Sequence, residues 1–496
     1  MNANLKGKII RTVSVCGDIF LVVFCIAFSL GLAGVYTDFI NTAAMYSVAF
    51  LIFLVFNFIM FELYSVKAEN VYNVLVATEI SAIITYVIVY IISRFLRANQ
   101  QPIAFWGLLA VTLLPLLGAW RSLIAIAKKK IGEKRSLLII ENMSNTSRLA
   151  RKLKYASNEE NQSWYHLLDE NDEEELQTIL DDVIEKFDAI FISPRISNRI
   201  SSKILYRGLS MGKEVNILAD VDGVTTLRGS VYQIDDTPVI VKKGIHLTKL
   251  QKFIKRGFDI VFAVIAAIVT APIMLGCAAA IKLDSEGPVF YKQERYTIRK
   301  KVFNVYKFRT MVNDAEKNGA QLATENDPRI TRVGRVLRAL RLDELPQIYN
   351  ILTGSMSVVG PRPERPVFAD EFSKVIDSYD MRFCLKAGLT GYAQVYGKYN
   401  TRVSDKILMD IAYGTTYSFL LDIKLILLTI KIMFMKSATS GVDEERDTAL
   451  SSSDREIKRR SHAVRFMDDT ADEKQRNKAS GVKGNEGIGN NSGIQL

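Results

Sequence analysis

Two adjacent carboxylates, Asp343 and Glu344, lie in the segment RALRLDELPQ, shortly before Pro346. Proline suits the first turn of a helix, because the amide proton it lacks would have no partner there. Carboxylates at such a helix start lie in the positive field of the helix dipole, where they stay ionised and where a divalent cation or a phosphate can gather nearby. The pair alone is equally compatible with ordinary helix capping.

Further motifs rich in glycine, proline and basic residues surround the pair in the sequence. They are SEGP at 285–288, QER at 293–295, KFRTM at 307–311, MSVVGPRPE at 356–364 and KAGLTG at 386–391. Rigid turns that project Arg309, Arg338 and Arg362 toward the carboxylates would suit a diphosphate, which needs several cationic donors and usually Mg²⁺. Core packing does not explain such a set, and solvated surface arginines are the competing interpretation.

Other residue types that often carry chemistry are scarce. The three histidines stand in dissimilar regions, and Cys16, Cys25 and Cys277 lie in apolar stretches, which leaves Cys384 alone in a basic region. This distribution excludes a disulfide framework and a thiolate zinc site, and it argues against a histidine relay. Chemistry is therefore expected to rest on carboxylates and basic residues.

Residues 252–436 resemble the polyprenyl-phosphate hexose-1-phosphate transferases, often called bacterial sugar transferases. The shared motifs, in the family's order, are KRxxD at 255–259, an apolar segment broken at Pro272, KFRTM, DPRIT at 327–331, LDELPQ and GPRPE. Together these motifs are highly specific. With the N-terminal features described below, the chain is similar to the large-topology membrane form of the family, which includes undecaprenyl-phosphate glucose or galactose phosphotransferases.

The resemblance implies transfer of hexose-1-phosphate from a UDP-hexose, glucose or galactose, to undecaprenyl phosphate. The motifs do not separate these two sugars, and an N-acetylated sugar stays open. The products would be undecaprenyl-diphosphate-sugar and UMP, in the initiating step of exopolysaccharide, capsule or O-antigen synthesis. Asp343 would attack the sugar-bearing phosphate and form an aspartyl phosphosugar intermediate, while Glu344, together with Asp343, would hold Mg²⁺. The expected substrate-binding residues are Arg309, Arg338, Arg362, Lys398 and Asp410.

Several positions depart from the family pattern. The segment YTIR at 296–299 replaces a turn that contains glycine, Ala387 replaces a usual proline, and Ala271 replaces a usual serine before Pro272. Lys398 stands where the family often carries arginine, which replaces a two-pronged donor by a point charge. None of these departures removes a charged catalytic group.

Four apolar segments near 13–36, 42–64, 72–93 and 103–127 are each long enough to cross a bilayer. Basic residues precede the first segment and follow the fourth, so both ends are expected in the cytoplasm. The first segment lacks a small-residue cleavage site and three more follow it, which argues against a signal peptide. Glu79, inside the third segment, is expected to pack within the bundle.

A fifth apolar segment, 253–282, contains Pro272 and has basic residues at both ends. Because both ends then favour the cytoplasmic side, the pattern predicts a re-entrant helix broken at Pro272 rather than a kinked full span. Residues 418–435 are apolar with interspersed charges, which is typical of a helix lying on the membrane surface. The net charge of +11 suits a bilayer surface and phosphorylated substrates better than nucleic acid.

Residues 134–243 alternate short apolar strands with polar helices, which predicts a Rossmann-like α/β domain. The segment ENMSN after the first strand contains no glycine, so a dinucleotide site is not expected there, and a structural or regulatory role is favoured. After residue 437 large apolar residues are few, which predicts a disordered tail.

The expected fold is membrane α-helical with four transmembrane helices, plus an α/β Rossmann-like domain and an α+β catalytic domain with a re-entrant membrane helix. In chain order the predicted parts are the four-helix transmembrane region (1–133), the degenerate Rossmann-like domain (134–243), the linker and re-entrant helix (244–282), the catalytic domain (283–436) and the tail (437–496).

A multi-pass location in the bacterial inner membrane, with a cytoplasmic catalytic domain, is expected. The expected partners are a UDP-sugar, undecaprenyl phosphate, the lipid bilayer and, by analogy only, a second copy of the chain. Two other functions stay open: a metal-dependent phosphohydrolase that uses the same carboxylate pair and needs only water, and a non-catalytic scaffold of polysaccharide assembly.

Overall fold

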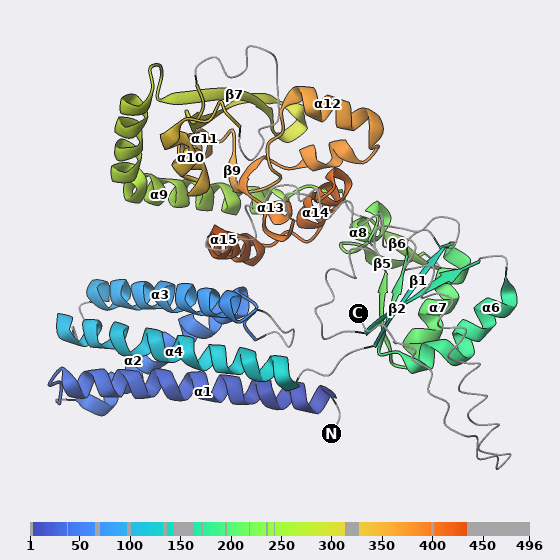
Figure 1. The fold of residues 1–496 in the computed structure, drawn as a ribbon, viewed down its shortest axis with the longest axis horizontal. Helices are drawn as coiled ribbons and strands as arrows, with labels where there is room; N and C mark the ends of the chain where they lie inside the picture. The colour runs from blue at the N-terminus through green and yellow to red at the C-terminus, as the bar shows by residue number, and fades with distance from the viewer. Residues whose placement is uncertain are drawn as a thin grey trace, which may run out of the picture. The chain divides into compact units, whose positions relative to one another are not determined.

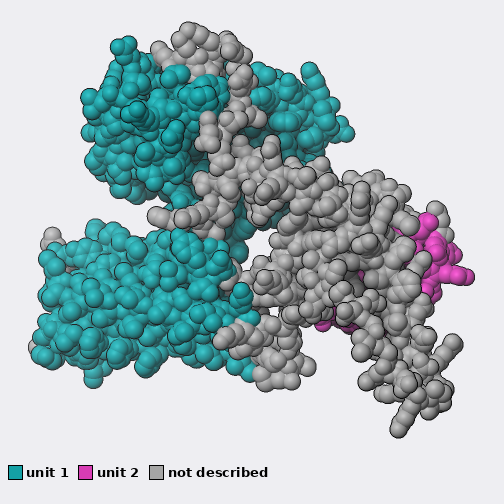
Figure 2. All heavy atoms as spheres, viewed as in Figure 1, with its two compact units in different colours: residues 1–131, 221–442 teal, residues 132–220, 443–496 magenta. Residues whose placement is uncertain are grey.

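The computed structural model describes residues 3–36, 38–64, 70–96, 101–131, 136–142, 162–169, 172–193, 196–217, 219–234, 237–242, 244–312, 327–397 and 401–433. Contacts divide the chain into two compact units (Figure 1, Figure 2). The larger unit joins the described residues of 1–131 to those of 221–433, and the smaller unit comprises the described residues of 132–220. The predicted tail, 437–496, lies outside the described residues.

Four long helices form the N-terminal part of the larger unit. They are α1 (Ala3–Leu32), α2 (Phe39–Met60), α3 (Val71–Leu96) and α4 (Ile103–Ile131). Each predicted apolar segment forms one of them, and each contains a stretch long and apolar enough to cross a membrane. α4 packs against α1 and α3, and α2 packs against the same two helices, so their inward side chains share one apolar core.

The bundle also encloses charge that the sequence analysis did not single out. Arg121 of α4 and Asp18 of α1 are both 1% exposed and form an ion pair of 2.5 Å. Ser14 accepts a further hydrogen bond from Arg121 at 2.9 Å. Glu79 of α3 lies so close to Gly118 of α4 that a side chain at Gly118 would overlap its carboxylate, in agreement with the packing role expected for Glu79.

The smaller unit contains a four-stranded parallel sheet in the order β2-β1-β3-β4. Its elements are β1 (Ser136–Asn142), β2 (Gln162–Leu168), α6 (Glu173–Thr178), η1 (Ile179–Val183), η2 (Ile184–Lys186), β3 (Ala189–Ile192), α7 (Asn198–Ser210) and β4 (Glu214–Ile217). Parallel neighbouring strands need crossover connections, which helices usually supply. Buried isoleucines and leucines of β1 and β3 pack against buried apolar side chains of these helices in one core. Residues 143–145, where no phosphate loop is expected, lie outside the described residues.

A short helix and a hairpin follow, α8 (Val221–Thr226), β5 (Ser230–Ile234) and β6 (Thr237–Val241). They fall within the predicted α/β range 134–243, but contacts group them with the larger unit, where α8 packs against α14 (Val403–Thr415). The sheet of the smaller unit ends before them.

The longest helix, α9 (Lys249–Asp284), is the fifth one long and apolar enough to cross a membrane. A capping box starts it, since Thr248 and Gln251 exchange side-chain and backbone hydrogen bonds. Pro272 lies inside the helix, and α9 turns a corner along its length in Figure 1. The Thr270 hydroxyl donates to the Ala266 carbonyl at 2.7 Å.

The remaining elements build an α+β body around α9. They are β7 (Phe290–Tyr296), η3 (Ile298–Lys300), β8 (Val302–Phe308), α10 (Arg332–Ala339), η4 (Leu342–Glu344), α11 (Gln347–Thr353), β9 (Ser357–Val359), α12 (Pro366–Val375), η5 (Tyr379–Cys384), β10 (Gly388–Thr390), α13 (Tyr392–Tyr396), α14 and α15 (Phe419–Met433). β7 and β8 form an antiparallel hairpin, whereas β9 and β10 pair in parallel.

Both halves of α9 pack on this body. Ala263, in the first half, belongs to the core of β9, α11 and α14, and Cys277 and Ile281, in the second half, contact Phe308 and Leu337. The charges among the apolar residues of α15 predicted a helix lying on the membrane surface. Two of these charged side chains, Asp422 and Lys431, are instead buried in the protein. They therefore do not face lipid headgroups.

Candidate active site

The carboxylate pair lies in a single 3₁₀ turn between two helices. Thr331 caps the start of α10 by accepting the amide of Gly334 at 2.9 Å, and α10 ends at Ala339. Arg341 then adopts the left-handed conformation, with φ of 55°, and turns the chain into η4. Pro346 follows η4 and caps α11, so the proline ends the turn that carries the carboxylates. The predicted helix therefore follows Pro346, with the proline at the N-cap and the carboxylates in the 3₁₀ turn before it.

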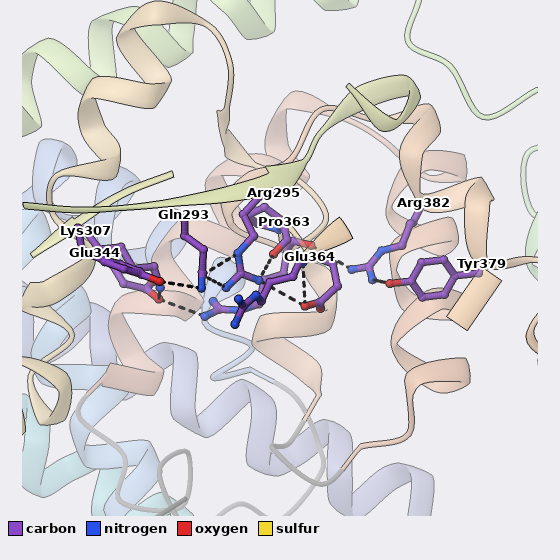
Figure 3. Close-up of polar contacts among 11 residues, drawn as sticks. Gln293, Arg295, Lys307, Glu344, Pro363, Glu364, Tyr379 and Arg382 are labelled. Atoms are coloured by element: carbon purple, nitrogen blue, oxygen red, sulfur yellow. Dashed lines mark hydrogen bonds and ion pairs between the residues drawn. The ribbon is translucent and has the colours of Figure 1, made fainter. Parts of the chain in front are cut away.

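Glu344 is held by two cations from separate segments. Its Oε1 atom accepts a hydrogen bond from Lys307 Nζ at 3.2 Å (Figure 3). The same atom accepts a second hydrogen bond from Arg362 Nη2 at 3.1 Å. Burial alone would raise the pKa of Glu344, but the charges of Arg362 and Lys307 outweigh it and lower the pKa to about 2. Glu344 therefore stays ionised throughout the neutral range.

Asp343 differs from its neighbour. Among the described residues, its carboxylate forms no hydrogen bond or ion pair with another side chain. Burial and the charge of Glu344 raise its pKa, while Lys307 and Arg338 act in the opposite direction. The structure thus holds one carboxylate of the pair and leaves the other available to a ligand.

Arg362 lies on the GPRPE loop, which leaves the paired strands β9 and β10. The amide of Gly360 donates to Thr390, and the amide of Gly388 donates to Pro361, at 2.8 and 2.9 Å. A side chain at Gly388 would overlap the backbone of Gly360, so glycine is required where these two segments approach each other. The crossing of the two segments fixes the start of the loop.

Arg338, another expected phosphate ligand, is half-buried on α10. Its charge acts on Asp343 and also on Asp327, the first residue of DPRIT. Asp327 accepts hydrogen bonds from the guanidinium of Arg329 at 2.8 and 2.6 Å, and this contact lowers its pKa to about 2. The structure therefore places Arg362 in contact with Glu344 and Arg338 on the helix that leads into the carboxylate turn; binding of phosphate by either arginine stays a prediction.

Arg309 is used differently in this structure. It is 5% exposed, and its guanidinium donates to the carbonyls of Ser285 and Glu286, both at 2.7 Å, and to the Ser285 hydroxyl at 3.0 Å. These contacts close the turn that follows α9. Contact of Arg309 with substrate stays a prediction.

Asp410 is 2% exposed on α14 and forms an ion pair of 2.9 Å with Arg382. Burial raises the pKa of Asp410 to about 6, although Arg382 opposes the shift. Its contact is therefore with an arginine and not with the carboxylate pair. Lys398, the remaining expected ligand, lies outside the described residues.

Sequence reasoning missed three basic residues of this network: Lys307, Arg295 and Arg382. Lys307 and Arg295 lie in motifs that were noticed, KFRTM and QER, whereas Arg382 lies in no such motif. Arg295 donates to the Pro363 carbonyl at 3.2 Å and to Glu364 at 3.3 Å. The only signal in the sequence was the position of two of them inside glycine-, proline- and arginine-rich motifs.

Three charged residues at the start of α9 fix it to the body. Lys255 pairs with Asp422 at 2.6 Å, and both side chains are buried. Arg256 donates to two carbonyls at the end of α11 at 2.6 and 2.7 Å. Asp259 accepts the amide of Val358 in β9 at 3.0 Å. The KRxxD motif therefore connects α9 to the two elements that flank the carboxylate pair and the GPRPE loop.

Comparison with known proteins gives a consistent result. A family model described as bacterial sugar transferase matches residues 250–436. The chain is similar to the UDP-N-acetylgalactosamine-undecaprenyl-phosphate N-acetylgalactosaminephosphotransferase of Aeromonas hydrophila, with 45% identity over 182 residues, 36% of this chain and 43% of that protein.

Two further relatives differ in how much of their length is matched. The UDP-glucose:undecaprenyl-phosphate glucose-1-phosphate transferase of Escherichia coli (strain K12) is 36% identical over 230 residues, 45% of this chain and 49% of that protein. The exopolysaccharide production protein PSS of Rhizobium leguminosarum bv. phaseoli is 38% identical over 186 residues, 36% of this chain and 93% of that protein. The chain spans about half the length of the first curated relatives it matches.

Proposed function

This chain belongs to the bacterial sugar transferase family, and we propose that it transfers a sugar-1-phosphate from a UDP-sugar to undecaprenyl phosphate. Two of the relatives named above act, by their names, on UDP-N-acetylgalactosamine or UDP-glucose. The observation that carries the proposal is the unequal state of the two carboxylates. Glu344 is fixed by Lys307 and Arg362, whereas Asp343 has no side-chain partner among the described residues.

In the proposed reaction, an ionised oxygen of Asp343 forms a bond to the phosphorus that carries the sugar. The bond from that phosphorus to the bridging oxygen breaks, and UMP leaves with the bridging oxygen and its electron pair. The phosphate oxygen of undecaprenyl phosphate then attacks the same phosphorus, which releases Asp343 and gives undecaprenyl-diphosphate-sugar. Arg362 and Arg338 would bind the phosphate oxygens, where negative charge is concentrated.

The carboxylate pair also fits Mg²⁺. Magnesium in such sites is held by one or two carboxylates, with substrate phosphate and water as its other ligands. No group of three histidine, cysteine, aspartate or glutamate side chains suited to a metal occurs within the ranges that the structure describes. Asp343 and Glu344 would therefore hold the ion in part, and its chemistry would be to neutralise phosphate charge.

We propose that α9 enters the membrane from the cytoplasmic side and returns to it. A straight helix of 36 residues would be about 54 Å long, yet both halves of α9 contact one folded body. Apolar side chains on both sides of Pro272 are exposed, among them Ile268 at 70% and Leu275 at 73%. Such a helix would keep the carboxylate pair at the level of lipid phosphates, in a bacterial inner membrane with the catalytic part in the cytoplasm.

For the smaller unit we propose a degenerate Rossmann-like fold with a structural or regulatory role. Its support is the all-parallel strand order β2-β1-β3-β4. The sequence after β1 lacks the glycines that a dinucleotide phosphate needs.

The test is multiple-turnover UMP release by the full chain in nanodiscs with Mg²⁺. The donors are UDP-glucose, UDP-galactose and their N-acetylated forms, each with and without undecaprenyl phosphate. Asp343→Asn is compared with Asp181→Asn, a control at an exposed site in the smaller unit. Lipid-dependent UMP from one donor, lost only in Asp343→Asn, is the expected result. UMP without lipid would favour a phosphohydrolase, and no UMP from any donor would favour a scaffold.

A further inference from the structure

The GPRPE loop is held by its carbonyl groups. Each of the four consecutive carbonyls from Pro361 to Glu364 accepts a hydrogen bond. The donors, in loop order, are Gly388 N at 2.9 Å, Arg382 Nη2 at 3.1 Å, Arg295 Nη1 at 3.2 Å and Tyr296 N at 2.9 Å. Because the two prolines have no amide proton, their carbonyls are the only backbone groups through which they can be hydrogen-bonded. The loop is therefore fixed from outside.

Two of the four donors are guanidinium groups, and they bind the two central carbonyls (Figure 3). Arg382 comes from η5 and Arg295 from β7, so the loop is held by elements that are remote from each other in the sequence. The residue between the two bound prolines is Arg362, whose side chain contacts Glu344. Arg382 and Arg295 thus hold the backbone at and next to Arg362, the loop residue whose side chain contacts the carboxylate pair.

Arg382 is itself fixed in position. It is 6% exposed, pairs with the buried Asp410 at 2.9 Å, and donates through Nη1 to the hydroxyl of Tyr379 at 3.1 Å. Burial of such an ion pair often contributes little to stability compared with apolar packing, because both charges lose their hydration. A contribution to the geometry of the loop accounts for this arrangement better than a contribution to stability.

The side chain of Arg362 has little support of its own. It is 45% exposed, and its contact with Glu344 is a single hydrogen bond of 3.1 Å. A long, partly exposed arginine loses considerable rotamer entropy when it binds a phosphate. A fixed backbone reduces the number of positions that its guanidinium can reach.

We propose that Arg382 and Arg295 are positioning residues that hold the GPRPE loop, so that Arg362 points at a diphosphate bound beside Asp343 and Glu344. This inference rests on the proposed function for the identity of the ligand. Neither arginine has to touch the ligand, and their effect on it passes through Arg362.

The experiment is a double-mutant cycle on the full chain in nanodiscs. UDP is the probe, and its Kd is measured for the parent, Arg382→Lys, Arg362→Ala and the double variant. Lysine keeps the charge near Asp410 but cannot bind the Arg362 carbonyl and the Tyr379 hydroxyl together as a fork. In the parent background, we expect Arg382→Lys to raise the Kd for UDP about tenfold, which corresponds to the loss of one charge-assisted hydrogen bond. In the Arg362→Ala background, the same substitution should change the Kd less than twofold.

Two variants guard against loss of folding. Tyr379→Phe keeps the aromatic ring and removes only the hydroxyl that orients Arg382, so a smaller weakening of the same kind is expected. Arg199→Lys, at an exposed ion pair in the smaller unit, is the matched control and should leave UDP binding unchanged. Equal losses in the parent and Arg362→Ala backgrounds would overturn the inference. Because UDP binding is measured without turnover, a parent that binds UDP but transfers no sugar would contradict only the proposed function.

Discussion

Arg362 donates to Glu344 at 3.1 Å, and it does so through the same Oε1 atom that accepts Lys307 at 3.2 Å. One carboxylate oxygen therefore neutralises part of the charge of two cations, which come from the GPRPE loop and from strand β8. Among the described residues, neither Glu344 Oε2 nor the carboxylate of Asp343 forms a hydrogen bond with another side chain. The two acids thus have different environments although they are adjacent in the chain.

Replacement of Glu344 by glutamine should reduce both activity and stability. The amide would leave Lys307 and Arg362 without their anionic partner, at a cost of about 1–3 kcal/mol for charge-assisted hydrogen bonds. We expect UMP release to fall about 100-fold, because the cations would no longer be held at the phosphate site. UMP release and the melting temperature are measured together, with Glu371→Gln on the exposed face of α12 as control. Equal behaviour of the two variants would contradict this assignment.

The Asp410 pKa of about 6 predicts a pH-dependent contribution to stability. A folded-state pKa above the ordinary value of 3.8 means that protonation favours the folded state. Asp410 therefore contributes about 3 kcal/mol to the free energy of unfolding below about pH 3.8, and this contribution is lost as the pH rises through 6. The groups that act on Asp410 are Arg382, Glu364 and Lys406.

Asp410→Asn removes this titration. We therefore expect the melting temperature of the parent, relative to Asp410→Asn, to be lower at pH 7 than at pH 5. The other carboxylates titrate in both proteins, so their effect cancels when the difference in melting temperature between the parent and Asp410→Asn is compared at the two pH values. A difference that is constant between pH 5 and 7 would show that Asp410 does not titrate in this range.

Lys255→Met should be strongly destabilising. Methionine fills a similar volume, but it leaves the buried carboxylate of Asp422 without its lysine partner. Among the described residues, the hydroxyl of Tyr413 is then the one side chain still bonded to it. Removing one partner of a buried pair costs about 3–5 kcal/mol. The double variant Lys255→Met with Asp422→Asn should recover part of the melting temperature, and Lys252→Met, at an exposed site on the same helix, should have little effect. A single variant as stable as the Lys252 control would mean that the pair is dispensable.

The sequence was sufficient where the signal is local. Each apolar segment became one helix, because about 20 apolar residues in succession have few other stable environments. The start of a helix at Pro346, shortly after Asp343 and Glu344, was also predictable, because capping and proline effects act over a few residues.

Contacts between remote residues were not accessible in this way. Lys307 and Glu344 are 37 positions apart, and Asp18 and Arg121 are 103 positions apart. Residue type also does not say which atoms a side chain will bond. Arg309 was expected to bind phosphate, and its residue type alone could not show that its guanidinium donates to the backbone carbonyls after α9. Such contacts depend on how segments far apart in the sequence come together in the fold, and a single sequence carries no direct signal for them.

The proposed path of α9 predicts that its two ends lie on the same side of the membrane. Cysteines are introduced one at a time at Lys252, before the apolar part, and at Lys301, in the hairpin that follows α9, in a background without the four natural cysteines. Both residues are exposed. A membrane-impermeant maleimide should label both positions in inside-out vesicles and neither in intact spheroplasts. Labelling of the two positions from opposite sides would show that α9 spans the bilayer, in which case the contacts of its second half with Phe308 and Leu337 could not coexist with those of Lys255 and Asp422.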